Sequence, residues 1–164
     1  MPHRLRRKGR EIFGLFELQG RDLARARIGN RQVRSALRII RSCISTGTNG
    51  YLENPRSSLI WHVLSKALKK FLSTGEAKYI NVDMCMYGVP WKKPTRILAF
   101  GPWASSISLK TCHGRGTCDR THRPHEQLSS SISCSYGVKN GKWRTSFAQV
   151  YPVRFVNDLL KHIK

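Results

Sequence analysis

A short apolar segment, residues 50 to 53, leads directly into an acid, an amide and a proline, Glu53-Asn54-Pro55. Proline has no backbone N–H and biases the residue before it toward an extended conformation. The segment is therefore predicted to be a strand that stops at Asn54, with a helix starting at Pro55 or the serines after it. Glu53 would then lie at the carboxyl end of a strand, where open α/β sheets bind ligands. The simpler alternative is that Glu53 and Asn54 only cap the next helix.

A second group of chemically suited residues lies between positions 101 and 141, where cysteine, histidine, glycine and serine replace apolar periodicity. Thiolate and imidazole groups are ligands of tetrahedral zinc, and a metal would explain how so irregular a segment becomes ordered. The candidate ligands are Cys112, Cys118, His122 and His125, with His113 and Cys134 as alternatives. The two cysteines are separated by five residues, where about two to four are usual in zinc fingers. A polar loop without metal is the alternative.

The net charge indicates a polyanionic partner. The chain of 164 residues carries 30 Lys and Arg against 9 Asp and Glu, a formal charge of +21 with a pI near 10.7. Self-repulsion of this size destabilises a compact state, and no requirement of folding explains it. Because the basic residues are spread along the whole chain, nucleic acid is favoured over an anionic membrane, with DNA favoured and RNA as the alternative. A chain that is merely soluble and basic is the simplest interpretation.

Phosphate contacts are predicted on three segments. Residues 31 to 44 show apolar positions at helical spacing, flanked by an arginine stripe that contains no acid. Two lysines follow an aromatic loop, and three arginines lie among the cysteines and histidines. The predicted nucleic-acid-binding residues are Arg31, Arg34, Arg38, Arg41, Lys92, Lys93, Arg115, Arg120 and Arg123. Ordinary solvated surface is the alternative for each segment.

The elements that must position these residues follow from composition and periodicity. Residues 1 to 13 are expected to be a disordered basic arm. Helices are predicted over 31 to 44 with Asn30 as the cap, over 57 to 72 with Thr74-Gly75 as the stop, and after Pro152, with Val153, Val156, Leu159, Leu160 and Ile163 facing the core. Strands are predicted over 50 to 53, 78 to 86 and 95 to 100. Strand, helix and strand at this spacing favour a right-handed βαβ crossover and a single α/β domain over residues 14 to 164.

Two motifs resemble the cytosine-C5 DNA methyltransferase superfamily. One is Glu53-Asn54-Pro55, and the other is residues 83 to 95, Asp-Met-Cys-Met-Tyr-Gly-Val-Pro-Trp-Lys-Lys-Pro-Thr. The closer likeness is to a divergent branch found in phages and mobile elements, which carries Glu-Asn-Pro where Glu-Asn-Val is usual. The resemblance covers about residues 14 to 155 and implies a partial Rossmann-like sheet flanked by helices. The fold expected for the chain is therefore this α/β sheet together with the irregular Cys/His-rich loop inferred from its own residues.

The resemblance also implies a role for one acid. In the family a glutamate hydrogen-bonds the edge of a flipped cytosine and helps to protonate it while a cysteine attacks C6, and Glu53 matches that glutamate. The family's Pro-Cys nucleophile and its glycine-rich turn for S-adenosylmethionine are missing here. The chain is thus similar to the rear half of such a domain. S-adenosylmethionine would be used only if an upstream segment or another chain supplied the missing half.

The function expected from the sequence is nucleic-acid binding by a methyltransferase-like domain that is inactive alone. The alternative is a non-enzymatic RNA- or DNA-binding, or ribosome-associated, structural protein with zinc as a stabilising element. No serine-hydrolase elbow or phosphate-cradling Gly-Lys-Ser/Thr loop is present. Without an apolar run of membrane-spanning length or a secretory signal, an intracellular location, nuclear or cytoplasmic, is expected, and the arginine-rich amino terminus leaves mitochondria as an alternative. Five cysteines without a secretory context favour reduced thiols or a metal over disulfides.

Overall fold

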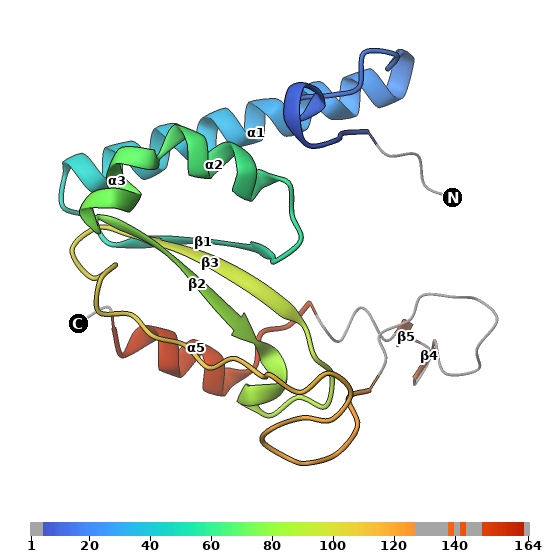
Figure 1. Cartoon of the computed structure of the whole chain (residues 1–164), viewed down its shortest axis with the longest axis vertical. Coiled ribbons are helices and arrows are strands. Elements are labelled where there is room, and N and C mark those ends of the chain that lie inside the picture. The colour runs from blue at the N-terminus through green and yellow to red at the C-terminus, as the bar shows by residue number, and fades with distance from the viewer. Residues whose placement is uncertain (1–4, 127–137, 140–141, 144–148, 163–164) are drawn as a thin grey trace. The chain divides into compact units, whose positions relative to one another are not determined.

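The computed structural model describes residues 5–126, 138–139, 142–143 and 149–162 (Figure 1). Its helices, where η denotes a 3-10 helix, are η1 (Gly9–Glu11), α1 (Gly20–Ser45), α2 (Ile60–Ala67), α3 (Lys69–Thr74), η2 (Met84–Tyr87) and α5 (Val153–Leu160). Its strands are β1 (Gly50–Pro55), β2 (Ala77–Asp83), β3 (Pro94–Phe100), β4 (Val138–Lys139) and β5 (Lys142–Trp143). None of the described helices is both long and apolar enough to cross a membrane.

The main sheet has three antiparallel strands in the order β1-β3-β2. At one end of the β1–β3 pair, the backbone N–H of Arg56 donates to the carbonyl of Pro94 at 3.1 Å. At the other end Gly50 lies so close to the Phe100 ring that a Cβ at position 50 would be 2.4 Å from it. β4 and β5 form a separate antiparallel pair.

This topology confirms the mixed α/β class but differs from the expected sheet. A Rossmann-like sheet is parallel, whereas β3 here lies between β1 and β2 and runs against both. The connection from η2 to β3, residues 88 to 93, is short, and a parallel pair needs a crossover of about a dozen residues or more. The chain therefore returns along β2 as an antiparallel neighbour, and the described strands form a small antiparallel sheet.

The internal contacts divide the chain into two compact units. Unit 1 consists of Met1–Tyr51, Ser57–Lys78 and Ala99–Ser105, and unit 2 of Leu52–Arg56, Tyr79–Leu98 and Ser106–Lys164. Each strand of the main sheet begins in one unit and ends in the other. Each unit therefore contains one end of the sheet.

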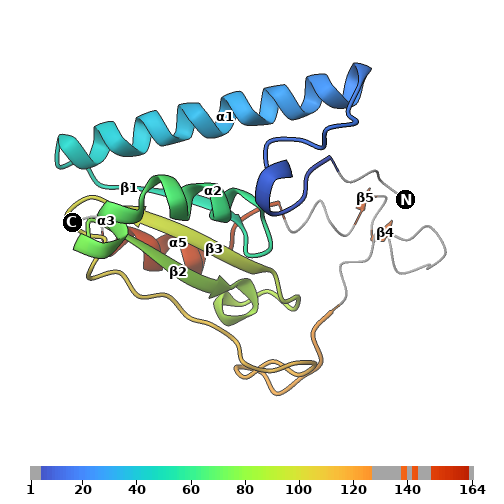
Figure 2. The same ribbon diagram turned by 45° about the horizontal axis from the view of Figure 1, so that its top comes forward.

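Unit 1 is built on the long helix α1, which runs alongside α2 (Figures 1 and 2). The side chains of Ile40, Leu64 and Leu68 are almost completely buried, which stabilises the unit by about 1.5–3 kcal/mol each. The helix predicted over 57 to 72 is interrupted at Leu68, whose φ of −114° and ψ of 18° separate α2 from α3. Its predicted stop is confirmed, because Gly75 caps α3 in the left-handed conformation at φ 83°.

The amino-terminal segment differs from the expected disordered arm. The Arg6 guanidinium donates to the Ala26 carbonyl at 2.7 Å and to Asn30 Oδ1 at 3.1 Å, while Asn30 Nδ2 donates to the Phe13 carbonyl at 2.6 Å. Asn30 thus lies inside α1, which begins at Gly20, and does not cap it. Its side chain forms hydrogen bonds with the preceding segment instead. Residues 5 to 13, which include η1, are therefore fixed against the helix.

Unit 2 packs α5 against η2. The Phe155 ring meets the Tyr87 ring edge-on, with centroids 5.3 Å apart. The Tyr87 hydroxyl donates to Asp158 Oδ2 at 3.1 Å and accepts the backbone N–H of Lys110 at 3.0 Å. These contacts join three separate segments of the unit.

The predicted apolar face of the terminal helix is only partly correct. Pro152 precedes α5 as expected, and Leu159 is buried. Val153, Val156 and Leu160, which were expected in the core, are 73%, 38% and 51% exposed, while Phe155 is buried. Ile163 lies outside the described residues. Phe155 occupies the core position because its ring is the partner of Tyr87.

Candidate metal centre

Four side chains of the types that bind metal ions converge in unit 2. They are Cys85, Cys112, Cys118 and His125, and their potential ligand atoms all lie within 4.8 Å of one another. The three cysteines are buried, and His125 is half-buried. Cys112 Sγ and His125 Nε2 are 3.6 Å apart. This group of residues could hold a metal ion.

A buried carboxylate brings the two halves of the centre together. Asp83, the last residue of β2, is fully buried and accepts a bond from Arg56 Nη2 at 3.1 Å and one from the Cys112 backbone N–H at 2.9 Å. Its own N–H donates to the Lys110 carbonyl at 3.1 Å. The segment leading to Cys112 is therefore fixed along the end of β2, immediately before Cys85 in η2.

Two residues predicted to contact phosphate also make hydrogen bonds within the centre. The Lys92 ammonium donates to the carbonyls of Cys112 and Gly114 at 2.7 and 2.9 Å. Arg120 Nε donates to the carbonyl of Cys85 at 2.8 Å. Two of these three bonds hold the backbone carbonyls of candidate ligands, Cys112 and Cys85, so these side chains help to fix the positions of the ligands.

The imidazole of His125 is oriented by one backbone carbonyl. Both the backbone N–H and ring Nδ1 of His125 lie within hydrogen-bond distance of the Gly116 oxygen, at 2.9 and 3.1 Å. A carbonyl oxygen only accepts, so Nδ1 carries the proton in this contact and Nε2 keeps its lone pair. Such a second bond is the usual way in which a metal-binding histidine is fixed in one tautomer.

The thiols of the centre differ in acidity. Burial, together with the neighbouring thiols of Cys112 and Cys118, raises the pKa of Cys85 to about 12. Burial alone would raise the pKa of Cys118. Hydrogen bonds from the backbone N–H groups of Arg120 and Thr121 and from the Thr121 hydroxyl outweigh burial and lower the pKa to about 6. Three ionised thiols in this space would need a compensating cation.

The structure brings together three of the four predicted metal ligands. His122, the fourth, is exposed, has a positive φ of 53°, and uses its backbone N–H to bond the Cys118 carbonyl at 2.8 Å. Of the alternatives, His113 is exposed and Cys134 lies outside the described residues. Cys85 takes the fourth position. Sequence reasoning missed it because the residue was assigned to the strand predicted over 78 to 86.

The other predicted site residues are not among the four candidate ligands. Glu53 is in the second half of β1, as expected, and its Oε1 atom is buried without a hydrogen-bond partner among the described residues. The Nε atom of Arg56 is likewise buried without a hydrogen-bond partner among the described residues. The Lys93 ammonium lies 4.8 Å from the centroid of the Tyr151 ring. Arg115 and Arg123 are exposed on the Cys/His loop.

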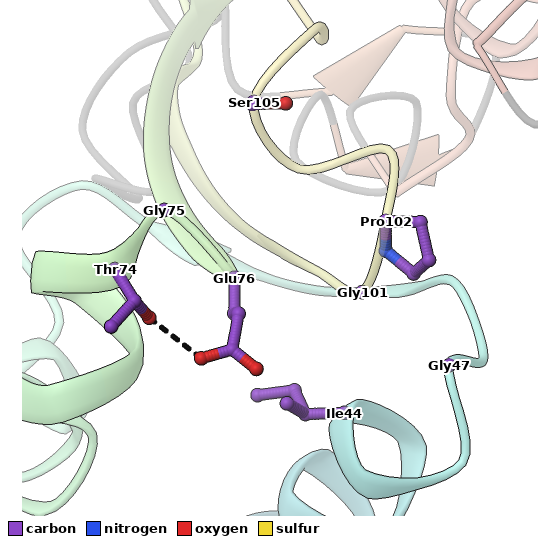
Figure 3. A pocket seen from close by; sticks show the side chains of 8 residues that line it. All are labelled: Ile44, Gly47, Thr74, Gly75, Glu76, Gly101, Pro102 and Ser105. Carbon is purple, nitrogen blue, oxygen red and sulfur yellow. Dashed lines mark hydrogen bonds between the residues drawn. The ribbon is translucent and has the colours of Figure 1, made fainter.

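Unit 1 contains a separate pocket of about 290 Å³ beside the ends of α1 and α3 (Figure 3). Its lining includes Glu76, which accepts a 2.6 Å bond from the Thr74 hydroxyl, with Ile44 nearby. No predicted site residue lines this pocket, and its lining has no cysteine, histidine, lysine or arginine.

Comparison of the chain with models of known families, with curated proteins and with solved structures finds no match.

Proposed function

We propose that this protein binds nucleic acid through helix α1 and that a zinc ion holds its Cys/His loop. The observation that carries the first part is the arrangement of arginines on α1. At about 100° per residue, five of them fall within an arc of about 80° and extend over about 21 Å of helix. We call this group the arginine face; it consists of Arg27, Arg31, Arg34, Arg38 and Arg41, all exposed.

The charge of the arginine face is not offset within the helix. Asp22 is the only acid in α1, and it pairs at 3.8 Å with Arg25, which lies outside the arc. One residue of the face, Arg41, donates to the Ala67 carbonyl at 3.1 Å. Like charges three and four residues apart destabilise a helix. A row of phosphates would remove that repulsion and release counterions, which supports a nucleic-acid backbone as the partner.

The donor set and its spacing support zinc. Three thiolates and one imidazole are a common set for structural zinc. In a tetrahedral zinc site, sulfur and nitrogen ligands lie about 3.6 Å apart, which matches the distance between Cys112 Sγ and His125 Nε2. Zinc binding would displace the thiol protons and compensate the negative charge of the three thiolates. With four protein ligands the site would be closed to substrate, so its proposed role is to order the loop.

The buried thiols also support the expected intracellular location. None of the four cysteines in the described residues forms a disulfide. Thiol ligands persist where glutathione and thioredoxin keep them reduced, as in the cytosol and nucleus.

The arginine face is tested by measuring affinity for a duplex DNA against salt concentration. R34Q/R38Q removes two charges from the face. R21Q/R25Q removes the same charge at the same spacing from the same helix, but outside the arc. For duplex DNA each lost phosphate contact should reduce the slope of log affinity against log salt by about 0.9. We expect R34Q/R38Q to reduce the slope by about 2 and the control to reduce it by less than 1. A wild-type affinity that does not change with salt would refute the proposal.

A cytosine methyltransferase-like role is the second candidate, and Glu53 favours it. A buried carboxylate oxygen without a partner is costly unless a ligand satisfies it, and the edge of a base could do so. A methyl-transfer assay of this chain with a cofactor-binding partner and S-adenosylmethionine tests the role. If the chain has this role, the wild type should transfer methyl groups in this assay. Glu53→Gln should abolish the transfer and retain the affinity for nucleic acid. If no methyl transfer is observed under any of these conditions, the protein is a non-enzymatic nucleic-acid-binding protein.

A further inference from the structure

A pocket of about 260 Å³ lies beside the metal centre in unit 2. One wall is residues 88 to 90, which follow Cys85 closely in the chain. The opposite wall belongs to the loop between Cys118 and Glu126, and Cys118 itself is part of the lining. A metal bound by Cys85, Cys118 and His125 would therefore join the two walls directly.

Two hydrogen bonds hold the same walls together. The Glu126 backbone N–H donates to the Pro90 carbonyl at 3.0 Å, and Arg120 Nε donates to the Cys85 carbonyl at 2.8 Å. The first bond joins two backbone groups, and the second joins the Arg120 side chain to the backbone just before residues 88 to 90. The width of the pocket is thus set by the same contacts that position the ligands.

The lining has the chemistry of a nucleotide site. The guanidinium groups of Arg120 and Arg123 suit one phosphodiester group. Val89, Pro90 and Pro124 offer apolar surface to the face of a base. The lining also contains Glu126, an acidic residue whose charge would repel a second phosphate and whose carboxylate oxygens can accept a bond from the exocyclic amine of a base. One phosphate and one base match this set better than a di- or triphosphate.

We infer that this pocket binds one nucleotide of a single-stranded nucleic acid and that the metal centre holds it open. The inference rests on the proposed nucleic-acid binding and adds a strand preference and a second contact site to it. In a duplex the bases are paired and stacked, whereas single strands present unstacked bases to apolar or aromatic surfaces. Duplex DNA can reach the arginine face but cannot place a base in this pocket.

The test compares Arg123→Gln with Arg115→Gln in the full-length, zinc-loaded protein. Both residues are exposed arginines of the Cys/His loop, but only Arg123 lines the pocket. The probes are a fluorescein-labelled ten-nucleotide single-stranded DNA and a duplex of the same sequence, measured by fluorescence polarisation at one salt concentration. Zinc content is measured for each variant, because a variant that has lost zinc reports on the loop and not on the pocket.

We expect R123Q to weaken single-strand binding about tenfold, as for the loss of a charged hydrogen bond. R115Q measures the general electrostatic loss, which should be less than about threefold for an exposed charge. Duplex binding should fall equally in the two variants. Chelation of the zinc should reduce single-strand affinity at least as much as R123Q while leaving the difference between R34Q/R38Q and R21Q/R25Q on duplex DNA unchanged.

Equal losses for R123Q and R115Q on the single strand would overturn the inference while leaving the proposed function intact. Single-strand affinity that survives complete removal of zinc would overturn it as well. If the wild-type protein binds neither probe, the proposed function itself fails. The outcomes therefore separate a failure of the pocket from a failure of nucleic-acid binding.

Discussion

Replacing Cys85 with serine tests the metal centre most directly, because the sequence pattern and the structure choose different fourth ligands. The residue types in the loop predict His122 as a ligand, whereas the structure places Cys85 beside the other three candidate ligands. Cys85→Ser removes a thiolate donor and keeps the side-chain size. His122→Asn is the matched variant, since it removes an imidazole from an exposed position in the same loop.

The expected magnitude follows from dividing the binding energy among the ligands. Structural zinc sites bind with about 10–16 kcal/mol at neutral pH, or roughly 2.5–4 kcal/mol for each of four ligands. Losing one ligand should therefore weaken zinc binding by about 10²- to 10³-fold. At a fixed free zinc concentration, a hundredfold loss lowers the free energy of unfolding by up to about 2.7 kcal/mol. His122→Asn should change neither quantity measurably.

Two measurements check this expectation. Competition with a chromophoric chelator gives the zinc affinity, and the visible spectrum of the cobalt-substituted protein reports the number of thiolate ligands. Three thiolates are expected in the wild type and in His122→Asn, and two in Cys85→Ser. If Cys85→Ser binds zinc as tightly as the wild type, or if His122→Asn loses as much affinity, the four-ligand geometry is wrong. Should Cys85→Ser fail to fold, the His122→Asn result alone still decides whether His122 is a ligand.

Three further predictions concern stability and are measured by chemical denaturation. Asp83→Asn should lower the free energy of unfolding by about 3–5 kcal/mol, because it leaves Arg56 without its buried partner; a loss below about 1 kcal/mol would contradict the role of this pair. Tyr87→Phe should cost about 1–3 kcal/mol near neutral pH through its lost hydrogen bonds. Burial raises the pKa of Tyr87 to about 12, so the wild type should lose stability as the pH rises from about 10 toward 12, and the variant should lack that loss. Gly101→Ala should destabilise by about 1–3 kcal/mol, since φ is 92° and the new Cβ would lie 2.5 Å from a backbone carbonyl, whereas Gly116→Ala, with nothing within 4 Å, should be nearly neutral.

The features that the sequence predicted correctly are those set by neighbouring residues. Gly75 ends a helix because its left-handed conformation suits glycine, and Pro152 precedes α5 as a proline at a helix start should. The strand containing Glu53 and the helical pattern of residues 31 to 44 are equally local signals. Each depends on the conformational preferences of a few consecutive residues.

The features that the sequence did not predict depend on distant partners. Asn30 resembles a helix cap, but its amide is used by Arg6 and Phe13, so α1 extends far beyond it. The order of the strands is set by the β2–β3 connection rather than by the helix between β1 and β2. Cys85 reaches the centre because Asp83 holds the Cys112 backbone, a contact between two positions separated by the whole of β3.

The positions of the four ligands along the chain determine the order in which the centre can assemble. Cys112, Cys118 and His125 belong to one stretch of 14 residues, so that loop can capture an ion while the rest of unit 2 is still unfolded. Cys85 joins only when the loop has docked on the end of β2. With a metal bound as proposed, a chain in which docking fails would retain an incompletely coordinated ion, the state from which metal is lost and thiols are oxidised most readily. Formation of the fourth bond would then coincide with the completion of folding and would protect only the correctly folded molecule.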